Sequence, residues 1–247
     1  MHTFTMRILL LLISLISLAA THPTYGVTLP PPPLDPSKPA TSPYYPWRSR
    51  IASSANHVEK TTLYGLARTA HAQGHPHFAT YLQHYLSNTG RDASISPDEL
   101  MASLPAFRAE VHALAEFKAR LAFQSLLMNP ALNTISFSSF WHEYETTPEQ
   151  SWDWFLSLGR FVYSVTGVVR VDETGEAVTV RYKVHVFDFC DWDGERDLIM
   201  GQFRFREGEL PGLQVVGLAR EFKMRGSGEV VVVEGYTPAK GFPKVNG

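Results

Sequence analysis

Residues 161–190 read FVYSVTGVVRVDETGEAVTVRYKVHVFDFC, and this stretch decides the fold. Apolar or small residues occupy every second position before and after a central polar segment, which is the pattern of two strands that each bury one face. Asp172-Glu173-Thr174-Gly175 supplies a four-residue turn and predicts an antiparallel hairpin. In the expected register both apolar faces coincide. The expected pairs are Val171 with Glu176, Val169 with Val178, Val165 with Tyr182 and Phe161 with Val186.

The chain before this hairpin has the 3.6-residue period of helices. Asn56 is the expected N-cap of the first of them, and Ser96-Pro97 is a typical helix start. Helices are expected over residues 57–72, 77–86 and 106–128. The last has an apolar stripe that we expect to be buried, formed by Phe107, Val111, Leu114, Phe117, Leu121 and Leu127. Further strands are expected within 198–206 and 229–234, and a short helix over 210–218. Helices followed by a mostly antiparallel sheet predict an α+β fold.

Composition narrows the class of protein. The chain has 247 residues, of which 44% are hydrophobic, and this fraction is too high for a disordered protein. The formal net charge of −2 disfavours a nucleic-acid binder that relies on a basic surface. We therefore expect one globular domain with appendages and no nucleic-acid partner.

The N-terminal region predicts export. Residues 1–20 combine an early Arg7, an apolar run and small residues near Ala20, so they are expected to be a cleaved signal peptide. Residues 21–55 are a proline-rich arm or linker, since Leu29–Trp47 holds eight prolines that favour extended polyproline II geometry. Residues 56–247 form the single α+β domain, helical over 56–130 and β-rich over 156–235. The mature protein is expected to be secreted and without a membrane span.

An acidic segment follows the second strand of the hairpin. Asp188, Asp191 and Asp193 lie close together where this strand ends, and Arg196 follows them. By strand parity Asp188 lies on the buried face, opposite Gly159, where its carboxylate needs a hydrogen bond, a cation or a metal ion. Carboxylate oxygens are the ligands that hard cations prefer, so we expect either a site for Mg²⁺ or Ca²⁺ or a solvated acidic loop.

Four further features are weaker candidates. His185 is a possible acid or base, although its strand parity differs from that of Asp188. His71, His75 and His77 lack a standard zinc spacing and are expected at a solvated helix end. Trp141-His142-Glu143 lacks the second histidine of a zinc-protease motif, so His142 and Glu143 are expected on the surface. Cys190 is the single cysteine, and it is either buried and inert or a reactive or intermolecularly pairing thiol.

The hairpin Gly159–Val186 and three short segments together resemble C-terminal modules of secreted bacterial proteins, including polymorphic toxins, over residues 78–230. The short segments are His84-Tyr85-Leu86…Thr89-Gly90, Val186-x-Asp188-x-x-Asp191-Trp192-Asp193 and Gly217-Leu218-Ala219-Arg220-Glu221-Phe222…Gly226-Ser227. This resemblance implies no established activity.

Asp188-x-Cys190-Asp191 is also similar to the Asp-x-Tyr-Asp motif of colicin M-type bacteriocins, which are metal-dependent phosphodiesterases that cut a lipid-linked peptidoglycan precursor. Cysteine replaces the tyrosine here, and Arg196 alone stands where that family has His-Arg. The resemblance implies metal-binding roles for Asp188 and Asp191 and a phosphate-neutralising role for Arg196.

Two functions follow as hypotheses. The first is a secreted, non-catalytic, effector-like protein that binds a host, competitor or cell-envelope target. The alternative is a toxin-like, metal-assisted hydrolase of phosphodiester type. Its site would contain Asp188, Asp191 and Asp193 as metal ligands, Arg196 on the phosphate and His185 as acid or base.

Overall fold

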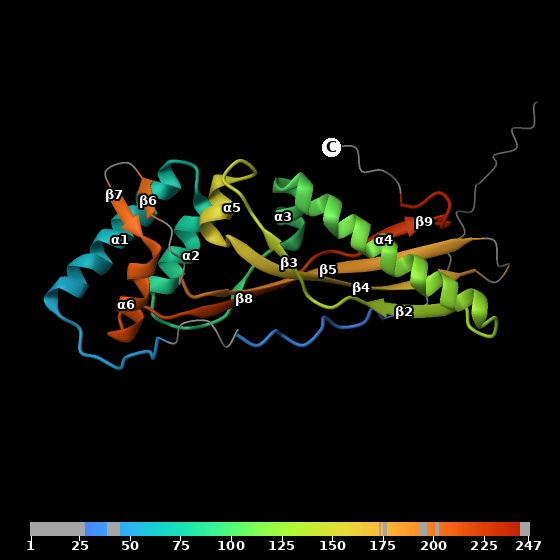
Figure 1. The fold of residues 1–247 in the computed structure, drawn as a ribbon, viewed down its shortest axis with the longest axis horizontal. Coiled ribbons are helices and arrows are strands. Elements are labelled where there is room, and N and C mark those ends of the chain that lie inside the picture. The colour runs from blue at the N-terminus through green and yellow to red at the C-terminus, as the bar shows by residue number, and fades with distance from the viewer. Residues whose placement is uncertain are drawn as a thin grey trace, which may run out of the picture.

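The computed structural model describes residues 28–38, 45–172, 174, 177–192, 197–200 and 203–242. The described residues form a seven-stranded sheet in the order β1-β8-β5-β4-β2, with β3 also paired to β4 and β9 to β5 (Figure 1). Every pairing is antiparallel except that of β1 with β8. The strands are β1 (Ala93–Ser94), β2 (Thr134–Ser138), β3 (His142–Glu145), β4 (Arg160–Val171), β5 (Val178–Cys190), β8 (Phe222–Ser227) and β9 (Val231–Glu234). The separate β6 (Asp197–Met200) and β7 (Phe203–Arg206) pair with each other.

The helices confirm the α+β class. Long α4 crosses one side of the β4–β5 hairpin, whereas α1, α2, α5 and α6 gather at one end of the sheet (Figure 1). Their bounds are α1 (Ser54–Ala72), α2 (Pro76–Leu86), α3 (Pro97–Ser103), α4 (Pro105–Met128), α5 (Trp152–Ser157) and α6 (Leu210–Val215). The N-cap of α1 is Ser53 rather than Asn56, which instead closes a capping box from the third helical position. None of the helices in the described ranges combines the length and apolar content needed to cross a bilayer.

The hairpin is present, but its expected register is wrong by two residues. Val171 pairs with Val178, and Val165 pairs with Val184. The turn begins one residue later because the Asp172 N–H donates to the carbonyl of Ala177 at 2.9 Å and extends the ladder by one pair. The Asp172 carboxylate also accepts the Ala177 N–H at 3.2 Å. An even shift leaves every side chain on its predicted face, which is why the apolar faces still coincide.

The buried stripe of α4 differs from the expected one. Phe117, Leu121 and Leu127 are 45%, 43% and 67% exposed, and smaller residues face the sheet instead. Alanine has the smallest apolar side chain, so a helix that presents it packs closely on β2 and β4. The residues that α4 buries are Phe107, Val111, Ala115, Ala119, Ala122 and Leu126.

The proline-rich arm lies on the other face of the sheet. Figure 1 shows residues 28–38 running along the sheet on the side away from α4. The carbonyl of Pro30 accepts the Thr166 hydroxyl at 2.9 Å, and the carbonyl of Leu34 accepts the Trp141 indole N–H at 2.8 Å. Asp35 pairs with Arg225 of β8 at 3.0 Å. Hydrogen bonds to its carbonyls therefore fasten this segment along the strands.

Candidate functional site

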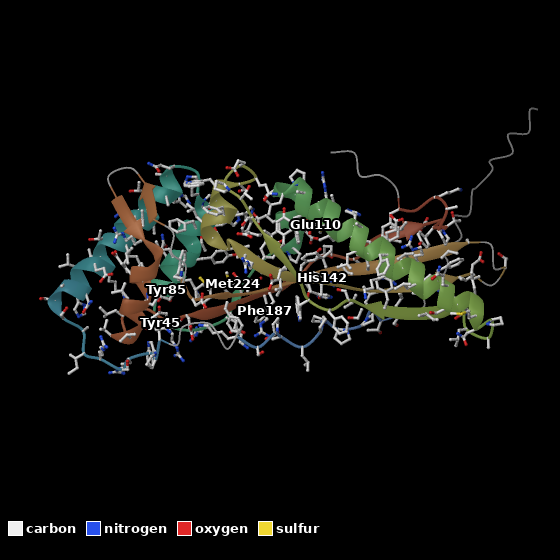
Figure 2. All side chains as sticks on the ribbon, in the orientation of Figure 1. Tyr45, Tyr85, Glu110, His142, Phe187 and Met224 are labelled. Carbon is white, nitrogen blue, oxygen red and sulfur yellow. The ribbon has the colours of Figure 1, made fainter. Side chains whose placement is uncertain are left out.

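Three parts of the chain meet at one end of the sheet, and we call their meeting place the β5–β8–α2 junction: residues 188–192, 219–224 and 81–90. Cys190 of β5 pairs with Phe222 of β8. The N–H of Arg220 donates to the carbonyl of Tyr85 at 3.0 Å, and the His84 ring lies 4.4 Å from that of Phe222. Figure 2 labels Tyr85 and Met224 at this end of the molecule. The fold thus brings together the three short segments that carry the resemblance to secreted bacterial modules.

Asp188 lies near the end of β5, and its carboxylate is half-buried. The carboxylate accepts the N–H of Phe189 at 2.8 Å, and the residue pairs with Met224 of β8. The expected position opposite Gly159 is wrong, because the observed register already sets Phe187 opposite Val162. Asp188 nevertheless lies on the same strand face as predicted.

Asp191 is in an ion pair with the arm. The Lys38 ammonium lies 3.0 Å from the Asp191 carboxylate and 2.8 Å from that of Glu221. Burial by itself lowers the pKa of Lys38, but the hydrogen bonds and charges of Glu221 and Asp191 outweigh it and raise the pKa overall. The Asp191 side chain is only 15% exposed. Two carboxylates from distant segments therefore converge on one cation at the junction.

His185 lies outside the junction, on the arm side of the sheet. Its Nδ1 is 2.7 Å from the Ser227 hydroxyl and its Nε2 is 2.9 Å from that of Thr166. Because the Thr166 hydroxyl donates to Pro30, it accepts from Nε2–H, so Nδ1 accepts from Ser227. Burial and the nearby Lys183 lower the pKa of His185 to about 4. The imidazole is therefore neutral at neutral pH, and the fold does not bring it together with Asp188 and Asp191.

The remaining predicted site residues, Asp193 and Arg196, lie outside the described residues. Among the residues that the structure describes, no group of three or more His, Cys, Asp or Glu side chains converges closely enough to hold a metal ion. The Cys190 thiol is buried. Burial raises the pKa of Tyr81 and Tyr85 far above the usual range, so both hydroxyls stay protonated. They donate to the carbonyls of Ser94 and Leu210 respectively.

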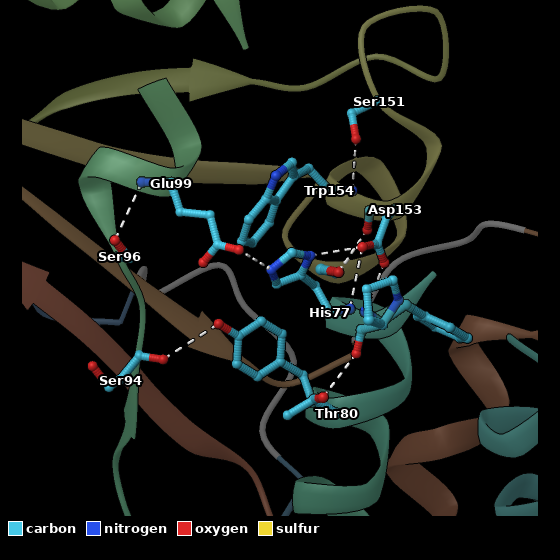
Figure 3. Close-up of polar contacts among 12 residues, drawn as sticks. His77, Thr80, Ser94, Ser96, Glu99, Ser151, Asp153 and Trp154 are labelled. Carbon is cyan, nitrogen blue, oxygen red and sulfur yellow. Dashed lines mark hydrogen bonds and ion pairs between the residues drawn. The ribbon is translucent and has the colours of Figure 1, made fainter. Parts of the chain in front are cut away.

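Sequence reasoning missed a second polar cluster, centred on His77 (Figure 3). Its Nδ1 lies 2.7 Å from Asp153 and its Nε2 3.0 Å from Glu99, while its ring stacks on Trp154 at 3.8 Å. Burial alone lowers the pKa of His77, but the two carboxylates raise it overall. Asp153 also accepts the N–H groups of His77 and Phe78 and so caps α2.

The expectation of a solvated helix end is therefore wrong for His77. The partners lie 76 and 22 residues away along the chain, and no local motif links them. His142 and Glu143 are exposed on β3.

Comparison with known proteins gives a partial likeness. No protein-family profile and no curated protein sequence matches this chain. PaeM, a colicin M-like bacteriocin of Pseudomonas aeruginosa, superposes with a TM-score of 0.35 and 14% identity over 65% of this chain and 51% of PaeM. Truncated syringacin M of Pseudomonas syringae pv. tomato DC3000 superposes with a TM-score of 0.31 and 13% identity over 64% of this chain and 59% of that protein. Pectocin M2 superposes with a TM-score of 0.29 and 16% identity over 65% of this chain and 54% of pectocin M2. The chain thus spans between half and three fifths of these proteins. The colicin M-type resemblance of the acidic motif and the polymorphic-toxin resemblance both stay predictions.

Proposed function

We propose that this protein is a secreted, toxin-like hydrolase of phosphate esters whose site is the β5–β8–α2 junction. The observation that carries the proposal is the convergence of Asp191 and Glu221 on the Lys38 ammonium at 3.0 and 2.8 Å. Two carboxylates held this close together have a high affinity for positive charge, and here the arm supplies it. When the arm lifts, the same oxygens become available to another cation.

Mg²⁺ or Ca²⁺ fits the chemistry of these donors. Mg²⁺ in particular is commonly held by one or two carboxylates together with the phosphates of a substrate, so it needs no complete cage of protein ligands. Asp191 and Glu221 would hold the ion, with Asp188 and Asp193 as further oxygen ligands. The ion would supply Lewis-acid polarisation of a phosphoryl oxygen. Arg196 is proposed to neutralise phosphate charge, since a guanidinium matches phosphate oxygens in a bidentate manner.

The test combines ion binding with hydrolysis. Wild-type protein should gain several degrees of melting temperature with millimolar Mg²⁺, Ca²⁺ or Mn²⁺. It should also hydrolyse a lipid-linked diphosphate or bis(p-nitrophenyl) phosphate. Asp191→Asn should abolish both effects, while Asp172→Asn, which changes a carboxylate beside the hairpin turn, should leave both intact. A wild-type protein that shows no response to any divalent ion and no hydrolysis would refute the proposal.

A non-catalytic binding role is the second candidate function. The outward face of α4 favours it, because Phe117, Leu121 and Met128 expose apolar surface there. In this case the toxin-like effect on target cells survives Asp191→Asn but is lost in a Phe117→Ser/Leu121→Ser double variant. If the effect is lost in Asp191→Asn but survives in the Phe117→Ser/Leu121→Ser double variant, the result supports the hydrolase.

A further inference from the structure

A pocket of about 640 Å³ lies beside the junction and shares Asn88 with it, but the junction's carboxylates do not line it. It is bounded by residues 47–52, the first turn of α1, Asn88 and residues 216–218. Arg48, Arg50 and His57 line it, and none of its lining residues is an aspartate or glutamate. The chain as a whole has a formal net charge of −2, so this concentration of basic groups is a local feature. We call it the Trp47 pocket.

One wall of the Trp47 pocket is held by interlocking contacts. The indole N–H of Trp47 donates to the Asn88 side-chain oxygen at 2.8 Å, and the Asn88 amide donates in turn to the carbonyl of Gly217 at 2.7 Å. The Arg220 guanidinium lies over the Trp47 ring, 4.6 Å from its centre. A bulky aromatic side chain is thus fixed in place although 39% of its surface remains exposed. This wall offers a rigid apolar surface to a ligand.

Two arginines supply the charge of the pocket. The backbone N–H groups of Arg48 and Arg50 donate to the carbonyls of Gln214 and Val215 at 3.0 Å each, so the backbone is fixed at the end of α6. Gly217 adopts φ +72°, and a Cβ at this position would lie 2.9 Å from Cγ of Arg48. The fold therefore leaves space for the Arg48 side chain beside the pocket.

The side chains of Arg48 and Arg50 are exposed. Within the described ranges neither Arg48 nor Arg50 forms an ion pair with a carboxylate. Arginine recognises phosphate by paired N–H···O bonds, and these are stronger than bonds between neutral groups. The neighbouring Trp47 and Ile51 add apolar surface, which inorganic phosphate does not use but an organic ester does.

We propose that the Trp47 pocket binds a phosphate ester, with Arg48 and Arg50 on the phosphate and Trp47 against the organic part. The ester is either a soluble phosphate ester or the headgroup of an anionic phospholipid, since the two share this chemistry. The pocket does not use Asp188, Asp191 or Glu221, so the inference does not depend on the proposed hydrolase activity.

The experiment measures binding to the full chain by calorimetry and vesicle sedimentation. The probes are glycerol 3-phosphate, inorganic phosphate, and vesicles of phosphatidylcholine with or without phosphatidic acid. Glycerol 3-phosphate binding identifies a soluble ester as ligand, and binding to phosphatidic acid vesicles alone identifies a lipid headgroup. In either case raised salt should weaken binding, because the attraction is between charges at an open surface. No binding to any phosphate ester at millimolar concentration overturns the proposal.

Variants separate the pocket from the rest of the molecule. Arg48→Gln/Arg50→Gln should lower affinity at least about tenfold, because two charge-assisted contacts are lost. Arg68→Gln removes one exposed positive charge from α1 and should leave affinity unchanged. Trp47→Ala should weaken the organic ester more than inorganic phosphate.

Asp191→Asn should bind the ester as wild type does, even where it abolishes hydrolysis, so the two proposals fail separately. Equal affinity in wild type and the Arg48→Gln/Arg50→Gln variant contradicts the assignment. If that double variant does not fold, as judged by circular dichroism, Arg50→Gln alone serves the same test.

Discussion

Acidification should destabilise the protein through one residue, His185. This residue is only 3% exposed, and burial with the nearby Lys183 lowers the pKa of its imidazole to about 4. In the unfolded chain the same imidazole titrates near pH 6.5. Protonation also converts Nδ1 from an acceptor into a donor, so the Ser227 hydroxyl that now donates to it at 2.7 Å must turn away. Acid therefore favours the unfolded state.

The size of the effect follows from the two pKa values. Between pH 6.5 and 4 the unfolded chain binds more protons than the folded protein, so the free energy of unfolding rises with pH. The contribution of His185 is complete above pH 6.5, and it falls by about 2 kcal/mol at pH 5 and about 3 kcal/mol at pH 4. His77 acts in the opposite sense: its pKa is raised, so its contribution is complete below pH 6.5 and is lost as the pH rises above that value.

Urea unfolding at pH 7, 6, 5 and 4 measures this contribution. His185→Gln keeps a donor and an acceptor but does not titrate, whereas the carboxylates titrate in both proteins and cancel in the difference. The free-energy difference between wild type and this variant should therefore shrink by about 3 kcal/mol between pH 7 and pH 4. His142→Gln, which changes an exposed histidine of β3, should show no such change. A difference that stays constant across the range would show that His185 is not held neutral by the fold.

Four substitutions test the packing. Asp153→Asn weakens the cap on two N–H groups of α2 and should cost about 2 kcal/mol in urea unfolding at pH 6. Gly226→Ala places a Cβ within 1.7 Å of the backbone oxygen of Ile95, so it should destabilise the protein by at least about 2 kcal/mol and lower its melting temperature. Phe107→Ala should cost about 3–5 kcal/mol and Phe117→Ala less than about 1 kcal/mol, and equal losses would contradict the observed stripe of α4.

The sheet was the most predictable part of the fold because the alternation of side chains between the two faces of a strand can be read directly from the sequence. The alternation in residues 161–190 assigns each side chain to a face, and a shift of two residues preserves that assignment. The register itself depended on whether Asp172 belongs to the turn or to the ladder, which its hydrogen bonds to Ala177 decide. β8 escaped prediction because its alternation contains only two large apolar side chains, Phe222 and Met224.

The buried face of α4 was predicted wrongly for a different reason. Its sequence has more apolar residues than one face can bury, so periodicity offers several overlapping stripes. The choice between them depends on how closely the helix approaches the sheet, and alanines at 115, 119 and 122 permit a closer approach than Leu121 or Phe117. The distance between a helix and a sheet is set by tertiary packing, and a local sequence pattern does not specify it.

The candidate site was likewise predictable from the sequence only in part. The acidic segment at the end of β5 was visible in the sequence because its carboxylates are neighbours along the chain. Its cationic partner was not, since Lys38 lies 183 residues from Glu221 and belongs to an arm that composition alone marks as a possible linker. The His77 cluster was invisible for the same reason: Asp153 stands 76 residues away. An ion pair between residues far apart in the sequence produces no periodic pattern in either segment.

The position of Lys38 has a thermodynamic consequence for the proposed hydrolase. Its ammonium and a divalent ion require the same oxygens of Asp191 and Glu221, so the two occupants exclude each other. Linkage then requires that the docked arm and the bound ion weaken each other's binding by the same factor. Lys38→Met should therefore increase the rise in melting temperature produced by millimolar Mg²⁺, and Arg68→Met, which removes an exposed cation of α1 that does not contact the arm, should not. Equal shifts in both variants would mean that the divalent ion, if it binds, does so away from Asp191.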